Sequence, residues 1–131
     1  MGNPSGNGKG TPGTFKTFVS AAIDPTAVLG PTGVYLPAGA IPLGVTTLGG
    51  ATGGVSPTID VSLAGGAAGG LANELPADAA AAAEVQAGVE LGAVLTADTE
   101  IEAGVGGSPA TGGITGFLVS YIIVDDGAIN S

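Results

Sequence analysis

The sequence contains no cysteine, no histidine, no tryptophan and no arginine. Without cysteine, the chain cannot form disulfides or bind zinc through thiolates. Without histidine, it lacks the commonest general base and the commonest metal ligand of proteins. Serine and threonine nucleophiles therefore have no imidazole to activate them, and the sequence predicts a protein that is not an enzyme.

Positive charge is also scarce, because Lys9 and Lys16 are the only basic residues against eleven acidic ones, for a net charge of −9. Both lysines lie near the start of the chain, so the remainder carries only negative charge. Binding to nucleic acid depends on lysine and arginine side chains that neutralise phosphates. The sequence therefore predicts no nucleic-acid partner and an acidic surface whose hydrated carboxylates keep the protein soluble.

Long apolar runs are missing as well. The first thirteen residues, MGNPSGNGKGTPG, lack the apolar stretch of a signal peptide. A long uncharged stretch at residues 103–124 is strongly apolar only from residue 114 onward, which fits a buried strand better than a membrane helix. We therefore expect no membrane partner.

The composition is dominated by small apolar residues, with 26 glycines and 9 prolines among 131 residues. A largely disordered Gly/Ala chain is one interpretation of such numbers. The abundance of Val, Ile and Leu favours another, in which short strands are separated by tight turns within one domain.

The clearest strand lies in residues 56–66, where Ile59, Val61 and Leu63 share one face and alternate with polar residues. Further strands are predicted at residues 14–20, 33–37, 38–50, 89–96, 99–105 and 114–126. Short strands with frequent turn signals are typical of sandwiches. We expect an all-β fold: a single β-sandwich or jelly-roll-like domain over residues 14–131, preceded by a flexible N-terminal arm of residues 1–13.

One segment favours a helix. In residues 75–88, LPADAAAAAEVQAG, Pro76 and Asp78 suit a first turn, the alanine run has high helix propensity, and Gly88 suits the C-terminal cap. We expect a short Ala-rich helix on the surface, although an extended segment remains an alternative. The preceding residues 64–73 are predicted to be a flexible connection.

The last predicted strand is apolar on both faces. One face carries Phe117, Val119, Tyr121 and Ile123, and the other carries Leu118, Ile122 and Val124. A strand of this kind is buried on both sides. In a small sandwich, one face would meet the core and the other a helix or another subunit.

Acidic residues offer the few candidates for a site. Asp125 with Asp126, or Asp98 with Glu100 and Glu102, could bind calcium through oxygen ligands. Their spacing matches no calcium loop, so solvated carboxylates are the favoured interpretation. A glycosidase pair is disfavoured by the shortage of aromatic side chains, and the glycine-rich segments lack the GK[ST] of a phosphate-binding loop. The sequence therefore predicts no catalytic residue, metal, cofactor or small-molecule substrate.

Five segments stand out by their order and sequence: LPAGAIPLGVTT (36–47), SPTIDVSLAG (56–65), ADAAAAAEVQAGV (77–89), ELGAVLTADTEIEAGV (90–105) and TGGITGFLVSYIIVDDG (111–127). Together they resemble the small decoration, or cement, proteins of tailed-phage heads. The resemblance covers residues 33–127, and it is weaker where such proteins commonly show a Phe and this chain has Leu48.

The resemblance implies a β-sandwich subunit, typically a homotrimer, that binds between major capsid proteins on the outer surface of the virion. Two hypotheses follow for the contact residues. The subunit interface would use Phe117, Leu118, Ile122 and Val124. The capsid contact would use Lys9, Phe15, Lys16 and Phe18, because the arm and the residues directly after it hold both cations and two aromatics and can order on a larger surface. A plain mobile terminus is the alternative for the arm.

Other functions remain open at this point. A phage fibre, knob or tail-surface module that binds a host receptor or glycan is the second hypothesis. A bacterial surface sandwich is the third, and the missing signal peptide disfavours it.

Overall fold

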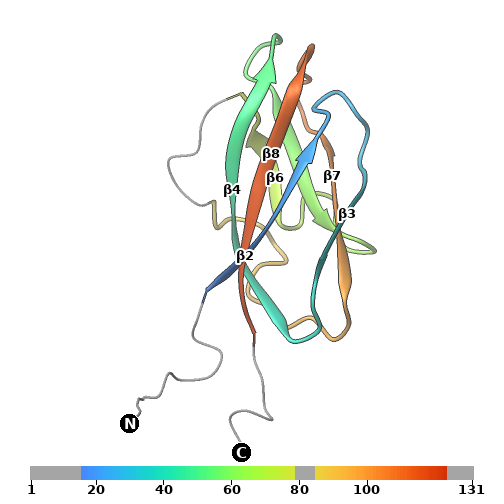
Figure 1. Cartoon of the computed structure of the whole chain (residues 1–131), viewed down its shortest axis with the longest axis vertical. Helices are drawn as coiled ribbons and strands as arrows, with labels where there is room; N and C mark the ends of the chain where they lie inside the picture. Colours follow the sequence, from blue (N-terminus) through green and yellow to red (C-terminus); the bar gives the residue numbers. More distant parts are fainter. Residues whose placement is uncertain (1–15, 79–84, 124–131) are drawn as a thin grey trace, which may run out of the picture.

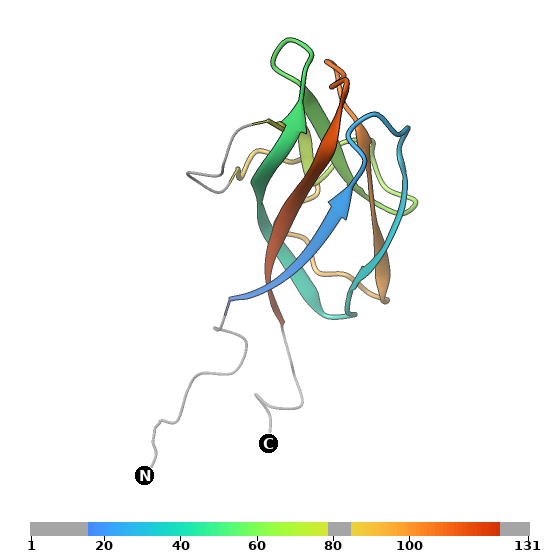
Figure 2. The same cartoon turned by 45° about the horizontal axis from the view of Figure 1, so that its top comes forward.

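The fold is a β-sandwich, seen in the computed structural model of the chain, which describes residues 16–78 and 85–123. The strands are β2 (Thr17–Ile23), β3 (Gly30–Leu36), β4 (Ala40–Thr52), β5 (Thr58–Leu63), β6 (Ala72–Pro76), β7 (Thr99–Val105) and β8 (Gly112–Ile123). They form a three-stranded sheet in the order β2-β8-β4 and a four-stranded sheet in the order β3-β7-β5-β6, both antiparallel. The two sheets lie face to face (Figures 1 and 2). The predicted all-β sandwich is confirmed.

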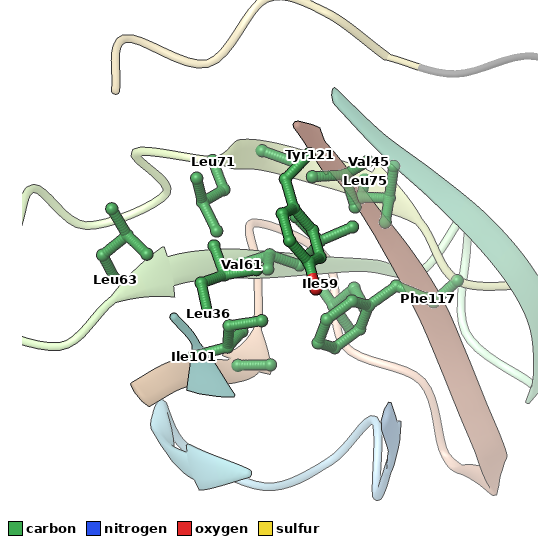
Figure 3. Packing of buried hydrophobic residues seen from close by; sticks show 14 of the residues in the cluster. Leu36, Val45, Ile59, Val61, Leu63, Leu71, Leu75, Ile101, Phe117 and Tyr121 are labelled. Carbon is green, nitrogen blue, oxygen red and sulfur yellow. The ribbon is translucent and has the colours of Figure 1, made fainter. Parts of the chain in front are cut away.

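The core fills the space between the two sheets (Figure 3). Strand β5 supplies Ile59, Val61 and Leu63, which are all buried, as the alternation in its sequence predicted. Strand β8 supplies Phe117 and Tyr121 from the opposite sheet. Burying an aliphatic or aromatic side chain of this size contributes roughly 1.5–3 kcal/mol relative to its exposure. The sandwich is therefore held by a core made of few aromatic and many aliphatic side chains.

Strand β8 is the centre of the three-stranded sheet. Its residue Val119 pairs with Val19 of β2 on one side and with Val45 of β4 on the other. All three valines face the core, and β-branched neighbours of this kind stabilise a sheet through cross-strand packing. Strands β2 and β4 are thus joined through β8, the last of the described strands.

Strand β4 has 13 residues, the same length as the predicted segment 38–50 that it overlaps, and it accommodates proline and glycine. The register of its pairing with β8 shifts between Pro42 and Gly44 and again around Gly49. Proline is tolerated in strands at such irregularities. At Gly50, with a φ of 107°, a Cβ would lie 2.1 Å from the carbonyl oxygen of Ile114. Only glycine permits this close approach between β4 and β8.

The helix predicted over residues 75–88 is wrong where the structure describes that segment. Leu75 and Pro76 end strand β6, and Val85 forms an isolated bridge to Val45 with N–O distances of 3.0 and 2.8 Å. The middle of the segment, residues 79–84, lies outside the described residues. A helix of methyl side chains buries little apolar surface, whereas the extended backbone occupies hydrogen-bonding groups on the edge of β4.

The strand predicted over residues 89–96 is also wrong. These residues form turns that bond to several partners in succession. The Glu90 N–H donates to Gly70, the Gly92 N–H to Pro42, and the Leu95 N–H to Ala40, each at 2.8 Å. The predicted connection at residues 64–73 is only partly a loop, because its last two residues belong to β6.

Candidate interaction surfaces

The strands distribute charge unequally between the two outer faces of the sandwich. Strands β2, β4 and β8 contain no charged residue. The other sheet carries Asp60 on β5, Glu74 on β6, and Glu100 and Glu102 on β7. Asp60, Glu100 and Glu102 alternate with buried residues, so they lie on the outer face of the four-stranded sheet. We call this outer surface, defined by these three residues, the acidic face.

The carboxylates of the four-stranded sheet bind backbone N–H groups. Glu100 accepts from the Gly33 N–H at 2.9 Å, and Asp60 accepts from the Glu74 N–H at 2.8 Å. In the turn before β7, Asp98 accepts from the Ala38 N–H at 2.9 Å. Within residues 16–78 and 85–123, no three acidic side chains are grouped closely enough to hold a metal ion. The calcium-binding alternative therefore gains no support from these side chains, and its other pair, residues 125–126, lies outside the described residues.

Asp24, in the turn after β2, is held in its charged form by a neighbour. Its carboxylate accepts from the Thr26 hydroxyl at 2.7 Å and from the Thr26 N–H at 2.9 Å. The hydroxyl bond, followed by the backbone bond, lowers the pKa of Asp24 below its ordinary value. This carboxylate stabilises the turn that leads from one sheet to the other.

The outer surface of the three-stranded sheet is apolar and uncharged. Phe18, Leu48 and Ile114 are 51%, 49% and 62% exposed. Half-buried aliphatic side chains lie beside them on the same face. We call this surface the neutral face, and its apolar members are Phe18, Ile41, Leu48, Ile114, Leu118 and Ile122.

Strand pairing places these residues together. Phe18 is opposite Ser120, Ile41 is opposite Ile122, and Leu118 lies between Ser20 and Thr46. Leu48 occupies a register shift in β4, and its Cδ1 atom lies 3.3 Å from the position that a Cβ of Gly116 would take. Its side chain therefore lies over β8 on the neutral face. The six apolar residues come from all three strands of the sheet.

The structure separates the residues predicted for the subunit interface. Leu118 and Ile122 lie half-buried on the neutral face. Phe117 is 0% exposed in the core of the single chain, so it is corrected from an interface residue to a core residue. The physical reason is the alternation of strand side chains, which sends Phe117 inward and Leu118 outward. Val124 lies outside the described residues.

The residues predicted for the capsid contact are described only in part. Phe18 lies exposed on strand β2, and Lys16 is exposed immediately before that strand. Lys9 and Phe15 lie outside the described residues, as does the whole predicted arm of residues 1–13. Of these four residues, Phe18 therefore lies within a strand of the three-stranded sheet.

Sequence reasoning missed three members of the neutral face. Ile114 could have been found, because it alternates in phase with Leu118 and Ile122. Ile41 and Leu48 could not, because the register shifts of β4 break the simple alternation from which a face is assigned.

Comparison with known proteins gives a likeness at the level of the fold. No family model matches the sequence, and no curated protein matches it. Among solved structures, the fold is similar to that of a chain in the cyanophage Pam1 capsid asymmetric unit. The similarity covers 95% of both chains with a TM-score of 0.63 and 21% sequence identity. A chain in a phage capsid structure therefore has a similar fold.

The described part of the chain contains no feature of a small-molecule site. No pocket opens between the strands or loops of residues 16–78 and 85–123. Over the same ranges, no helix has the length and hydropathy needed to cross a bilayer. The candidate sites considered below are the acidic face and the neutral face, as their exposed residues define them.

Proposed function

We propose that this chain is a structural component of a tailed-phage capsid that decorates the outer surface and stabilises the shell by binding between major capsid proteins. The observation that carries the proposal is the fold similarity to a chain of the cyanophage Pam1 capsid, which extends over 95% of both chains. The resemblance of several segments to phage decoration proteins points to the same role. It also suggests a homotrimer as the bound form.

The chemistry of the two faces supports this role. A protein repeated by symmetry across a shell needs one surface that binds its neighbours and another that stays in contact with water. The neutral face offers apolar area without charge, and the acidic face remains hydrated. Each bound copy stabilises the shell by mass action, because it binds the assembled form and not the dissociated one. Many modest contacts are enough when they are repeated over the lattice.

The capsid contact in this proposal includes the residues before β2. Lys9, Phe15 and Lys16 carry the positive and aromatic groups that could bind an acidic or apolar surface of the major capsid protein. Deleting residues 1–13 removes Lys9 and leaves every described strand intact. Deleting residues 127–131, which carry no charged side chain, is a control of similar kind at the other end.

The test mixes the purified chain with empty capsids that lack it and measures bound protein after sedimentation. We expect saturable binding at a high and fixed number of copies per shell, with a higher capsid melting temperature. We expect deletion of residues 1–13 to lower the occupancy and deletion of residues 127–131 to leave it unchanged. Absence of binding to capsids, or only a few copies per particle together with binding to host cells, would favour the fibre or tail-surface alternative.

A further inference from the structure

We propose that the neutral face is the surface through which one copy of this chain binds a second copy. The inference rests on the proposed function and deepens it, because it names the partner of one face. It also reassigns Phe18, which the sequence placed with the capsid contact, to the contact between copies.

The neutral face differs from the other exposed apolar residues of the chain. The exposed apolar residues outside it are scattered: Val28 and Leu29 before β3, Val55 after β4, and Val89 and Val94 before β7, all in loops. Tyr35 is exposed on β3, where its hydroxyl lies beside the Glu100 carboxylate. Phe18, Leu48 and Ile114 lie on one sheet surface, with the half-buried members of the neutral face beside them. Isolated apolar residues on a surface are ordinary, whereas contiguous ones mark an interaction site.

Charge selects the partner of this face. Each copy carries a net charge of −9, so two copies repel one another over most of their surface. Contact through the acidic face would bring Asp60, Glu100 and Glu102 of one copy towards those of the other. Contact through the neutral face brings together no charged residue of strands β2, β4 and β8. A basic partner would gain more from the acidic face, while a like-charged copy can approach closely through the neutral one.

The sizes of the side chains on the neutral face suit a contact between copies. Phe18 on β2 is opposite Ser120 on β8, and Ser120 is opposite Gly44 on β4. A large exposed aromatic ring therefore stands at one end of a row whose other members are small. Aromatic side chains that bury against a second chain commonly carry most of the binding energy of an interface. Ser120 and Gly44 are themselves buried in the single chain, so Phe18 is the exposed member of this row and the side chain placed to pack against the second copy.

The test uses the full chain alone, without capsids, and measures its mass by light scattering and sedimentation over a range of concentrations. We expect a multiple of 12.2 kDa for the natural chain. Phe18→Asp and Leu48→Asp should each weaken association at least tenfold. Val28→Asp and Val55→Asp are matched controls, because they add the same charge at exposed valines away from the face. They should leave association unchanged.

A second measurement guards against unfolding. All four substituted side chains are about half or more exposed, so far-UV circular dichroism and the unfolding midpoint should remain close to those of the natural chain. If Phe18→Asp disturbs β2, then Ile114→Asp, on another strand of the face, gives the same test independently. The expected result is loss of association with an intact fold.

Three outcomes would overturn the inference. The natural chain could stay at 12.2 kDa at all concentrations, or the face variants could keep the mass of the natural chain, or the control variants could dissociate equally. Binding to capsids is measured separately with the same variants. Self-association without capsid binding sinks the proposed function and leaves this inference standing. A single-chain species whose capsid binding is abolished by Phe18→Asp assigns the neutral face to the capsid protein and sinks this inference.

Discussion

Two residues on opposite faces of strand β8 should differ in how strongly truncation of their side chains lowers the stability of the fold. Phe117 is fully buried between the sheets, whereas Ile114 is 62% exposed on the neutral face. Replacing a core phenylalanine by alanine removes the burial of the ring and leaves a cavity, which costs about 3–5 kcal/mol. Replacing an exposed side chain away from special features changes stability by roughly 0.5 kcal/mol or less.

The expected loss of unfolding free energy can be converted into a change in the melting temperature, Tm. For a domain of this length, each kcal/mol lowers the Tm by roughly 3–5 °C, so Phe117→Ala should lower it by roughly 10–25 °C. The free energy of unfolding of a typical domain is about 5–15 kcal/mol, so a loss of about 3–5 kcal/mol removes a large fraction of it. Ile114→Ala should leave the Tm within roughly 2 °C of the natural chain.

Urea and thermal unfolding, followed by far-UV circular dichroism, measure both variants. The chain has no tryptophan, and the emission of its two tyrosines offers a second probe. One low protein concentration should be used throughout, because self-association would raise the apparent stability. A loss below about 1 kcal/mol for Phe117→Ala, or an equal loss for Ile114→Ala, would refute the assignment of the two faces of β8.

Further predictions concern loops and hydrogen bonds. The Thr115 hydroxyl is buried and lies 2.9 Å from two backbone carbonyl oxygens, so Thr115→Val should cost about 1–2 kcal/mol in urea unfolding while Thr115→Ser retains most of the stability. A Cβ at Gly88 would lie 2.2 Å from a backbone carbonyl oxygen, whereas at Gly112 its nearest neighbour would be 3.4 Å away, so Gly88→Ala should destabilise by about 1–3 kcal/mol and Gly112→Ala should be tolerated. Because bonds from Thr26 lower the folded-state pKa of Asp24, this carboxylate stabilises the fold at neutral pH and loses that effect as the pH falls below about 4. The difference in urea midpoint between the natural chain and Asp24→Asn should therefore shrink as the pH is lowered from 6 to about 3, and a difference that grows would contradict the sign.

The alternation of apolar and polar residues was enough to predict parts of strands β5, β7 and β8 from the sequence. Strand β7 has the bounds that were expected, residues 99–105, and the alternation of β5 correctly assigned its core face. The same alternation separated the two faces of β8, although the interface hypothesis then mixed residues from both. These features depend only on side-chain period, which a sequence displays directly.

Long-range contacts explain where sequence reasoning failed. The alanine run favours a helix by propensity, but the edge of β4 offers its flanking residues extended pairing, as at Val85. Residues 89–96 resemble a strand by composition, yet their N–H groups bond to separate partners on β4 and beside β6. Tertiary hydrogen bonding overrode local propensity in the described residues of both segments.

The order of the strands within each sheet could not be predicted from the sequence either. The neutral face exists because β2 and β4 both pair with β8, and nothing local to these segments indicates that they share a sheet. Its uncharged character follows from that order, since the acidic strands β5, β6 and β7 all join the other sheet.

The central position of β8 has a consequence for how the chain folds. Among the described strands, β2 and β4 pair within their sheet only with β8, which follows both in the sequence. During synthesis, both must therefore wait for residues 112–123, and the pairing of Thr17 with Tyr121 closes a loop of about a hundred residues. Contacts so distant in sequence make folding slow. The apolar surface of this sheet therefore cannot form before β8 has been made and has paired with both β2 and β4.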